Sequence, residues 1–139
     1  MTVVDASVVV SAAIQADAMH AASRSWLEET LGTGTRLFVP TLFLVEVAGA
    51  ITRRTRDQAL ARQTIDRFVD DPLVEVVAVD GLTDIAISAA MEHSLRGADA
   101  VYVALAQDLG VPLVTWDREL LKSASRLLYV LRPVIISSE

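Results

Sequence analysis

Apolar residues gather in short runs that are separated by segments long enough to form helices. The runs at residues 3–5, 37–39, 74–79 and 112–115 are bounded by Pro, Gly, Asp or Thr, which is typical of short buried strands. Residues 127–136 are also apolar, and we expect them to be extended, with Pro133 confining them to a sheet edge or a coil.

The segments between these runs have the apolar spacing and end signals of helices. Residues 42–51 are almost continuously apolar, and we interpret them as a buried helix because the run is too long for a typical strand. We expect Gly97 to open a turn before the next-to-last helix. The predicted helices cover residues 7–14, 18–31, 42–51 with a continuation through Arg54, 59–69, 82–93, 99–109 and 117–123.

Strands and helices alternate along the whole chain. This order predicts an α/β fold with three layers, in which a mainly parallel sheet of about four or five short strands has helices on both faces. We find no internal repeat, low-complexity tract or linker, so residues 1–139 are expected to form a single domain. In such folds the functional site lies at the carboxyl ends of the strands.

Four acidic residues lie where the chain would return to this edge of the sheet. Asp5 ends the first strand and Asp117 follows the strand predicted at 112–115. Glu46 lies about one turn into the helix after the second strand, and Asp99 begins a helix that leads away from the edge. Right-handed crossovers keep these positions on one side of the sheet.

Each acid alone has a simpler structural explanation. Asp5, Asp99 and Asp117 stand at expected helix starts, where a carboxylate commonly caps the helix. Glu46 lies inside an apolar helix, where burial is costly unless the charge is paired or metal-bound. Its structural alternatives are an exposed stripe of the helix or a salt bridge with Arg53 or Arg54.

Together, the four acids predict a site for a hard divalent cation. Carboxylates within roughly 4–6 Å of one another repel unless a cation lies between them. Oxygen ligands favour Mg²⁺ or Mn²⁺, whereas the absence of Cys and the distance between His20 and His93 argue against zinc or iron–sulfur sites. Such an ion can activate water and polarise a phosphate, so the pattern indicates phosphodiester hydrolysis.

The net charge and the composition also indicate which molecules the protein can bind and where it acts. A net charge of -6 argues against broad binding of nucleic acid by bulk charge, but Arg53 and Arg54 belong to an arginine-rich stretch. These arginines are candidate RNA-phosphate contacts, with a solvated helix face as the alternative, and Trp116 is a candidate base-stacking residue. No basic leader or membrane-length apolar run is visible, so we expect a cytoplasmic protein that does not contact a membrane.

At these residues the chain resembles the PIN-domain family. The resemblance covers essentially the whole length, and the single-domain size most resembles the VapC-type toxins of toxin–antitoxin pairs. It rests on four ordered segments: Val4-Asp5-Ala6-Ser7, Glu46 within residues 40–47, Asp99 within residues 97–106, and Leu113-Val114-Thr115-Trp116-Asp117.

The resemblance implies an endoribonuclease that uses Mg²⁺ or Mn²⁺, acts as a homodimer and binds a cognate antitoxin whose tail occupies the acidic groove. It assigns direct metal binding to Asp5 and Asp99, with Asp117 completing the site directly or through water. Glu46 would orient or deprotonate the attacking water. Two polar residues beside the acids would support them by hydrogen bonds: Ser7 and Thr115.

Two other classes of function remain open at this stage. One is a non-catalytic PIN-like module that binds RNA or a protein without cleavage. The other is a phosphatase or a receiver-type domain, which also begins with a strand and an Asp. The phosphatase needs a second Asp at the position that Ser7 occupies. The receiver-type domain needs a lysine near the end of a late strand, whereas Lys122 falls inside a predicted helix.

Overall fold

A sheet of five parallel strands forms the centre of the computed structural model, which describes residues 1–127 and 129–134. The strand order is β3-β2-β1-β4-β5, so the first strand lies in the middle and β5 at an edge. This confirms the predicted parallel sheet and the edge position of the last apolar segment. The strands are β1 (Thr2–Val4), β2 (Leu37–Pro40), β3 (Val74–Val77), β4 (Leu113–Val114) and β5 (Val130–Leu131).

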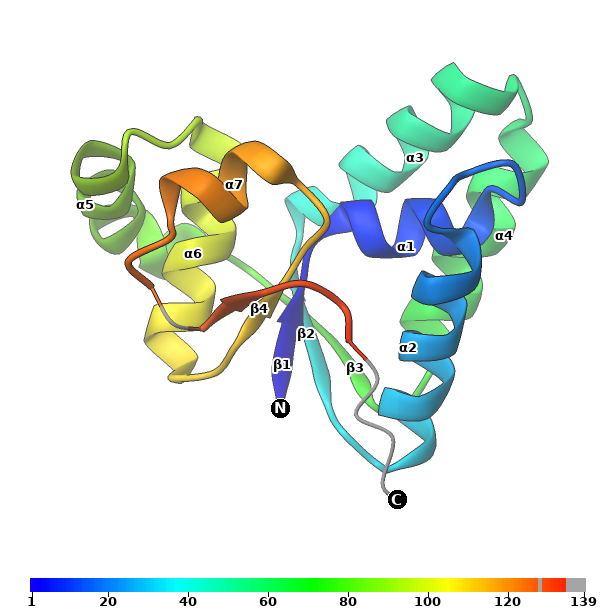
Figure 1. Ribbon diagram of the computed structural model, residues 1–139, viewed down its shortest axis with the longest axis horizontal. Helices are drawn as coiled ribbons and strands as arrows, with labels where there is room; N and C mark the ends of the chain where they lie inside the picture. The colour runs from blue at the N-terminus through cyan, green and yellow to red at the C-terminus, as the bar shows by residue number, and fades with distance from the viewer. Residues whose placement is uncertain (128, 135–139) are drawn as a thin grey trace.

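Helices cover both faces of the sheet and give the predicted three layers (Figure 1). One face carries α1 (Ala6–Ala13), α2 (His20–Gly32), α3 (Leu42–Thr55) and α4 (Gln58–Asp70). The other carries α5 (Thr83–His93), α6 (Gly97–Leu109) and α7 (Arg118–Ser123), and a 3₁₀ turn at Asp80–Leu82 precedes α5. None of the helices described is both long and apolar enough to cross a membrane.

The core forms where the sheet meets α1, α3 and α6. Val3 and Val4 of β1 are completely buried, and α6 is buried along most of its length from Tyr102 to Ala106. This burial explains why the sequence of α6 is so apolar: the helix packs against the sheet on one side and α5 on the other.

The helix predicted at residues 42–51 is confirmed as part of α3, but it is buried along one face only. Phe43, Val47 and Ile51 form one completely buried stripe of α3, whereas Val45 is 75% exposed. The reason is visible in Figure 1, where α3 extends away from the sheet and packs against α1 and α4. An apolar run on such a helix has only one face to bury.

Several predicted boundaries also shift. The strand predicted at 74–79 ends at Val77, and the predicted turn at Gly97 is instead the first residue of α6. Arg96 is in an extended conformation before α6, so Asp99 falls in the first turn of the helix rather than at its cap. Residues 128, 135 and 136 of the segment expected to be extended lie outside the described residues.

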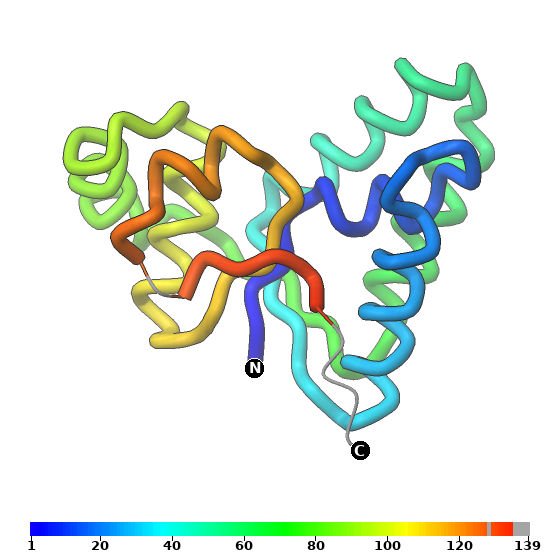
Figure 2. Tube along the Cα trace, in the orientation of Figure 1, coloured from blue at the N-terminus to red at the C-terminus, as the bar shows by residue number. Residues whose placement is uncertain are grey.

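The functional edge of the sheet is set by β1 and β4. Val4 pairs with Val114, and the backbone N–H of Asp5 donates to the Val114 carbonyl over 3.0 Å. In the Cα trace both chain segments leave the sheet at the same edge (Figure 2). The residues that follow these two strands, Asp5 and Thr115, are therefore neighbours.

Candidate functional site

A cleft of about 770 Å³ lies at the carboxyl edge of the sheet. All four acids line it, although they come from four different parts of the fold. Asp5 follows β1 and Asp117 precedes α7, whereas Glu46 lies in α3 and Asp99 in α6. The structure thus brings together the residues that the sequence placed at one edge.

Asp5 is buried and held by the residues beside it. It is only 7% exposed, and its Oδ2 accepts a hydrogen bond from Oγ1 of Thr115 over 2.7 Å. The Ser7 backbone N–H points at the same oxygen over a longer 3.4 Å, so Asp5 also caps α1. Asp5 therefore both caps α1 and lines the cleft.

Ser7 and Thr115 join the start of the chain to the segment that carries Asp117. Oγ of Ser7 accepts a hydrogen bond from the backbone N–H of Trp116 over 3.0 Å. Oγ1 of Thr115 accepts one from the backbone N–H of Asp117, also over 3.0 Å. The two hydroxyls lie 3.4 Å apart, so they fix the position of the acids on both sides of them.

Asp117 caps a helix, as the structural alternative predicted, whereas Asp99 does not. Oδ1 of Asp117 accepts a hydrogen bond from the backbone N–H of Leu120 over 3.1 Å and caps α7. Asp99 makes no capping bond, because the cap position of α6 is occupied by Arg96. Capping is thus wrong for Asp99, and for Asp117 it uses one oxygen and leaves the other toward the cleft.

Glu46 is oriented by Tyr102, a residue that the sequence reasoning missed. The phenol of Tyr102 donates to Oε1 of Glu46 over 2.6 Å, whereas no ion pair joins Glu46 to Arg53 or Arg54 among the described residues. The salt-bridge alternative for Glu46 is therefore wrong. A signal for Tyr102 was present, since it lies three positions after Asp99 and thus near the same face of α6.

The electrostatics of the cleft favour protons or cations. Burial raises the pKa values of Asp5, Glu46 and Asp99 above their ordinary values, and neighbouring carboxylates raise each of them further. Hydrogen bonds from Thr115 and Tyr102 oppose the rise at Asp5 and Glu46 without cancelling it. A positive ion among these groups would relieve both effects.

The donor chemistry fits a hard divalent cation, although a closed cage is not preformed. Within the part of the chain described, no three His, Cys, Asp or Glu side chains form a group that could hold a metal ion as placed. Mg²⁺ usually keeps several waters and binds through only one or two carboxylates, so it does not need such a cage. The carboxylate oxygens of the four acids, and the raised pKa values of Asp5, Glu46 and Asp99, fit this kind of binding.

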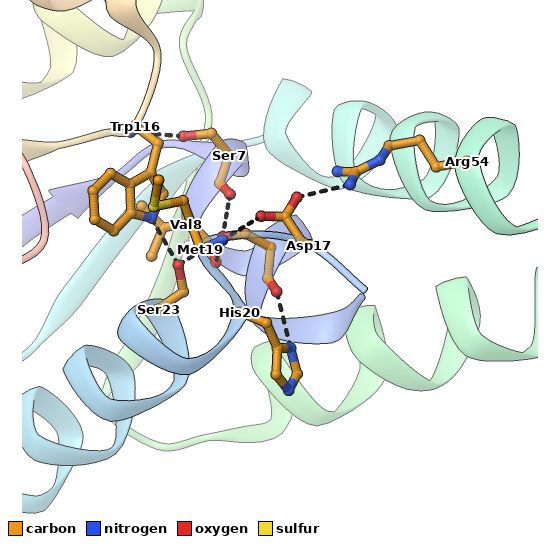
Figure 3. Close-up of polar contacts among 9 residues, drawn as sticks. Ser7, Val8, Asp17, Met19, His20, Ser23, Arg54 and Trp116 are labelled. Carbon is orange, nitrogen blue, oxygen red and sulfur yellow. Dashed lines mark hydrogen bonds and ion pairs between the residues drawn. The ribbon is translucent and has the colours of Figure 1, made fainter. Parts of the chain in front are cut away.

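Arginines line the same cleft beside the acids. Arg54 reaches from α3 to Asp17 in the loop between α1 and α2, with Nη2 2.7 Å from Oδ2 (Figure 3). Arg53 also lines the cleft, and its guanidinium lies so close to Gly49 that a Cβ there would come within 2.9 Å of Nη1. A third arginine, Arg96, contacts two of the acids and was not expected from the sequence.

Trp116 forms part of the cleft wall and is held at two points. Its backbone N–H bonds to Ser7, and its indole Nε1 donates to Oγ of Ser23 over 2.7 Å (Figure 3). Ser23 is completely buried and bonds in turn to Ser11 over 2.6 Å. The ring is therefore fixed against α2, and its role in base stacking stays a prediction.

Comparisons with known proteins bear on the fold and the family. A family model described as the PIN domain matches residues 2–126. Curated protein sequences give no significant match.

Three solved structures are similar at low identity. The VapC20 toxin of Mycobacterium tuberculosis, described as cleaving the sarcin–ricin loop, shares 18% identity with a TM-score of 0.75, over 94% of this chain and 97% of that one. A protein of Pyrobaculum aerophilum shares 24% identity with a TM-score of 0.67, over 94% and 82%. A toxin–antitoxin complex from Klebsiella pneumoniae shares 14% identity with a TM-score of 0.66, over 98% and 100%. At these identities the likeness shows a common fold, and the predicted PIN-like architecture is confirmed.

Proposed function

The chain belongs to the PIN domain family, and from this premise we propose that it is a metal-dependent endoribonuclease, the toxin of a toxin–antitoxin pair. The observation that carries the proposal is the meeting of four carboxylates in one cleft, three of them with raised pKa values. A fold alone would not carry it, because one fold can host many activities. The chemistry of the cleft makes the argument specific to this chain.

We assign the metal site to Asp5 and Asp99, with Asp117 completing it directly or through water, and the expected ion is Mg²⁺ or Mn²⁺. When bound, the ion would polarise a phosphate oxygen and lower the pKa of a water. Thr115 and Ser7 keep Asp5 in place, because their hydrogen bonds join it to the segment that ends at Asp117.

Glu46 is proposed to orient the attacking water and accept its proton. Tyr102 holds one carboxylate oxygen of Glu46, which leaves the other available on the cleft side. Burial raises the pKa of Glu46, and a carboxylate with a raised pKa is a stronger base once it is ionised. Both properties suit a group that takes a proton from water.

The arginine side of the cleft is proposed to bind the RNA backbone. Arg53 forms no ion pair within the described part of the chain and is exposed, so its guanidinium is available for a phosphate. Arg54 would have to break its ion pair with Asp17 before it could bind an RNA phosphate. Trp116 offers an aromatic surface in the wall of the same cleft.

The proposed partner is a cognate antitoxin protein. One of the similar structures is a toxin–antitoxin complex, which supports a partner of this type for the present chain. Its tail is expected to occupy the acidic groove and so to exclude RNA. The role places the protein in the cytoplasm, and the homodimer implied by the family resemblance stays a prediction.

The direct test is RNA cleavage by the purified protein with Mg²⁺ or Mn²⁺. We expect Asp99→Asn to lower the cleavage rate by at least about a hundredfold, since substitutions that merely support a metal ligand already cost 10–100-fold. Asp108→Asn is the matched control, because Asp108 makes the same charge change on the exposed far end of α6. It should leave the rate unchanged.

Two results would decide against the proposal. Cleavage that persists in a chelator, or at full rate in Asp99→Asn, would exclude a metal-dependent mechanism at these acids. RNA binding without cleavage under any divalent metal would favour the alternative, a non-catalytic module that binds RNA.

A further inference from the structure

Arg96 stands between two of the four acids. Its Nε lies 3.5 Å from Oδ2 of Asp99, and its Nη2 lies 3.5 Å from Oδ2 of Asp117. The arginine is 73% exposed at the side chain, whereas Asp99 and Asp117 are 14% and 31% exposed. An exposed cation in the cleft lining therefore faces carboxylates that are partly withdrawn from water.

The fold fixes this arrangement from two helix starts. Arg96 occupies the cap position of α6, and Asp99 follows three residues later in the first turn. Asp117 uses Oδ1 to cap α7, which leaves Oδ2 for Arg96. The contact between residues 96 and 117 thus joins the beginnings of α6 and α7 across the site.

We propose that Arg96 is the internal counter-cation of the site, which neutralises Asp99 and Asp117 until a divalent ion takes its place and which then binds the RNA phosphate. This inference rests on the proposed function. An ion held by Asp99 and Asp117 would neutralise the same two carboxylates that Arg96 now neutralises, so the two cations would compete. Ion pairs at an exposed arginine are weak, so this one yields readily to a divalent ion.

The released guanidinium suits the second part of this role. Arginine stays charged under all conditions that a protein tolerates, and its planar set of donors matches a phosphate. The side chain already lines the cleft, so its release from the acids would leave its positive charge free for a phosphate of RNA in that cleft. Arg54 is held by Asp17, and Arg53 lies beside Gly49 on α3, so neither has this direct link to the acids.

The test compares Arg96→Gln with the wild type in a calorimetric titration with Mn²⁺ at pH 7.5 and without RNA. We expect Arg96→Gln to bind Mn²⁺ about threefold to tenfold more tightly, because the ion no longer displaces two partly exposed ion pairs. At saturating Mn²⁺ the same variant should show a higher KM for RNA. A merely structural role for Arg96 would not produce tighter Mn²⁺ binding together with a higher KM for RNA.

Arg118→Gln is the matched control. Arg118 follows Asp117 in the sequence and is exposed, but among the described residues it makes no ion pair and does not line the cleft. Its loss changes the net charge equally, so its Mn²⁺ affinity should change by less than about twofold. Arg96→Lys keeps the charge and should retain competition with Mn²⁺ while losing the bidentate phosphate contact.

Each outcome separates this inference from the proposed function. Unchanged or weaker Mn²⁺ binding in Arg96→Gln, or equal tightening in Arg118→Gln, overturns the role of Arg96 even if the wild type cleaves RNA. Tightening that is specific to Arg96→Gln supports the counter-cation even if the wild type cleaves no RNA, in which case only the nuclease proposal fails. A wild type and an Arg96→Gln variant that both bind no Mn²⁺ overturn both.

Discussion

Tyr102 shows how one hydroxyl can fix the orientation of a carboxylate in the cleft. Its phenol is in the core of the protein, yet its oxygen donates to Glu46 at the edge of the cleft over 2.6 Å. Burial and the nearby carboxylates raise the pKa of the Tyr102 phenol, so the group stays protonated and always acts as the donor. Glu46 therefore has a fixed orientation in the proposed reaction.

We expect Tyr102→Phe to fold but to cleave RNA about tenfold more slowly, as for other residues that orient a site from behind. The hydrogen bond from Tyr102 lowers the pKa of Glu46, so its removal raises that pKa further. If ionised Glu46 is the base, the acidic limb of the pH–rate profile moves to higher pH. The measurement is kcat as a function of pH at saturating Mn²⁺.

The other tyrosine provides the control for this experiment. Tyr129→Phe removes a hydroxyl from the segment before β5, outside the cleft, and should leave the pH–rate profile unchanged. A Tyr102→Phe variant with the wild-type rate and profile would show that Glu46 needs no such support.

At the scale of elements, α3 carries both a member of the four acids and the arginines. Gly49 lies between Glu46 and Arg53 on this helix, and its missing side chain leaves the space into which the Arg53 guanidinium folds. A glycine inside a helix costs about 1 kcal/mol relative to alanine. The structure thus accepts a weaker helix where the arginine lies close to the backbone.

We expect Gly49→Ala to stabilise the protein by up to about 1 kcal/mol and to weaken RNA binding. The added Cβ would lie 2.9 Å from Nη1 of Arg53, so the flexible end of that side chain must move. Thermal unfolding measures the first effect, and KM for RNA measures the second. Arg53→Gln should reproduce the rise in KM without the gain in stability, and an unchanged KM in both variants would remove Arg53 from the RNA site.

The sequence predicted those parts of the site that depend on strand ends. Asp5 and Asp117 follow short apolar runs, and parallel strands bring such positions to one edge, so their meeting could be expected. Glu46 and Asp99 were placed by counting turns from predicted helix starts. This was sufficient because an error of one or two residues still leaves a helical side chain near the same edge.

The remaining features depend on contacts between distant segments, which periodicity does not contain. The role of Arg96 follows from its contact with Asp117, and the exposure of Val45 follows from how far α3 extends beyond the sheet. The start of α6 at Gly97 rather than Asp99 is a local effect: glycine is a poor helix former but is tolerated in the first turn. The contact between Arg96 and Asp117 and the exposed face of α3 therefore could not be predicted from the sequence alone.

At the scale of the whole molecule, three of the acids in the cleft make stability depend on pH. Asp5, Glu46 and Asp99 have pKa values raised above the ordinary 3.8, 4.5 and 3.8, mainly because of burial. The folded protein therefore binds protons more tightly than the unfolded chain at these groups. Their contribution to stability is complete below the ordinary values and is lost as the pH rises through the raised values.

We expect the metal-free protein to unfold at a higher temperature near pH 5 than near pH 7.5, by about 3 °C for each kcal/mol gained. Asp17 has the opposite shift, but its contribution is lost only below its ordinary value of 3.8, outside this interval. Saturating Mn²⁺ should reverse the trend, since it binds the ionised acids. Asp99→Asn should flatten it, whereas a metal-free melting temperature that falls steadily from pH 7.5 to 5 would contradict this reading of the cleft.

The hydrogen bond between Thr115 and Asp5 has a consequence for protein synthesis, because it joins side chains that are 110 positions apart. A ribosome makes Asp5 well before the segment around Asp117, so a nascent chain that stops between them holds only part of the site. Under the proposed function, the chain would therefore cleave no RNA before the segment around Asp117 has been made. The proposed antitoxin would have this interval in which to be made before the site is complete.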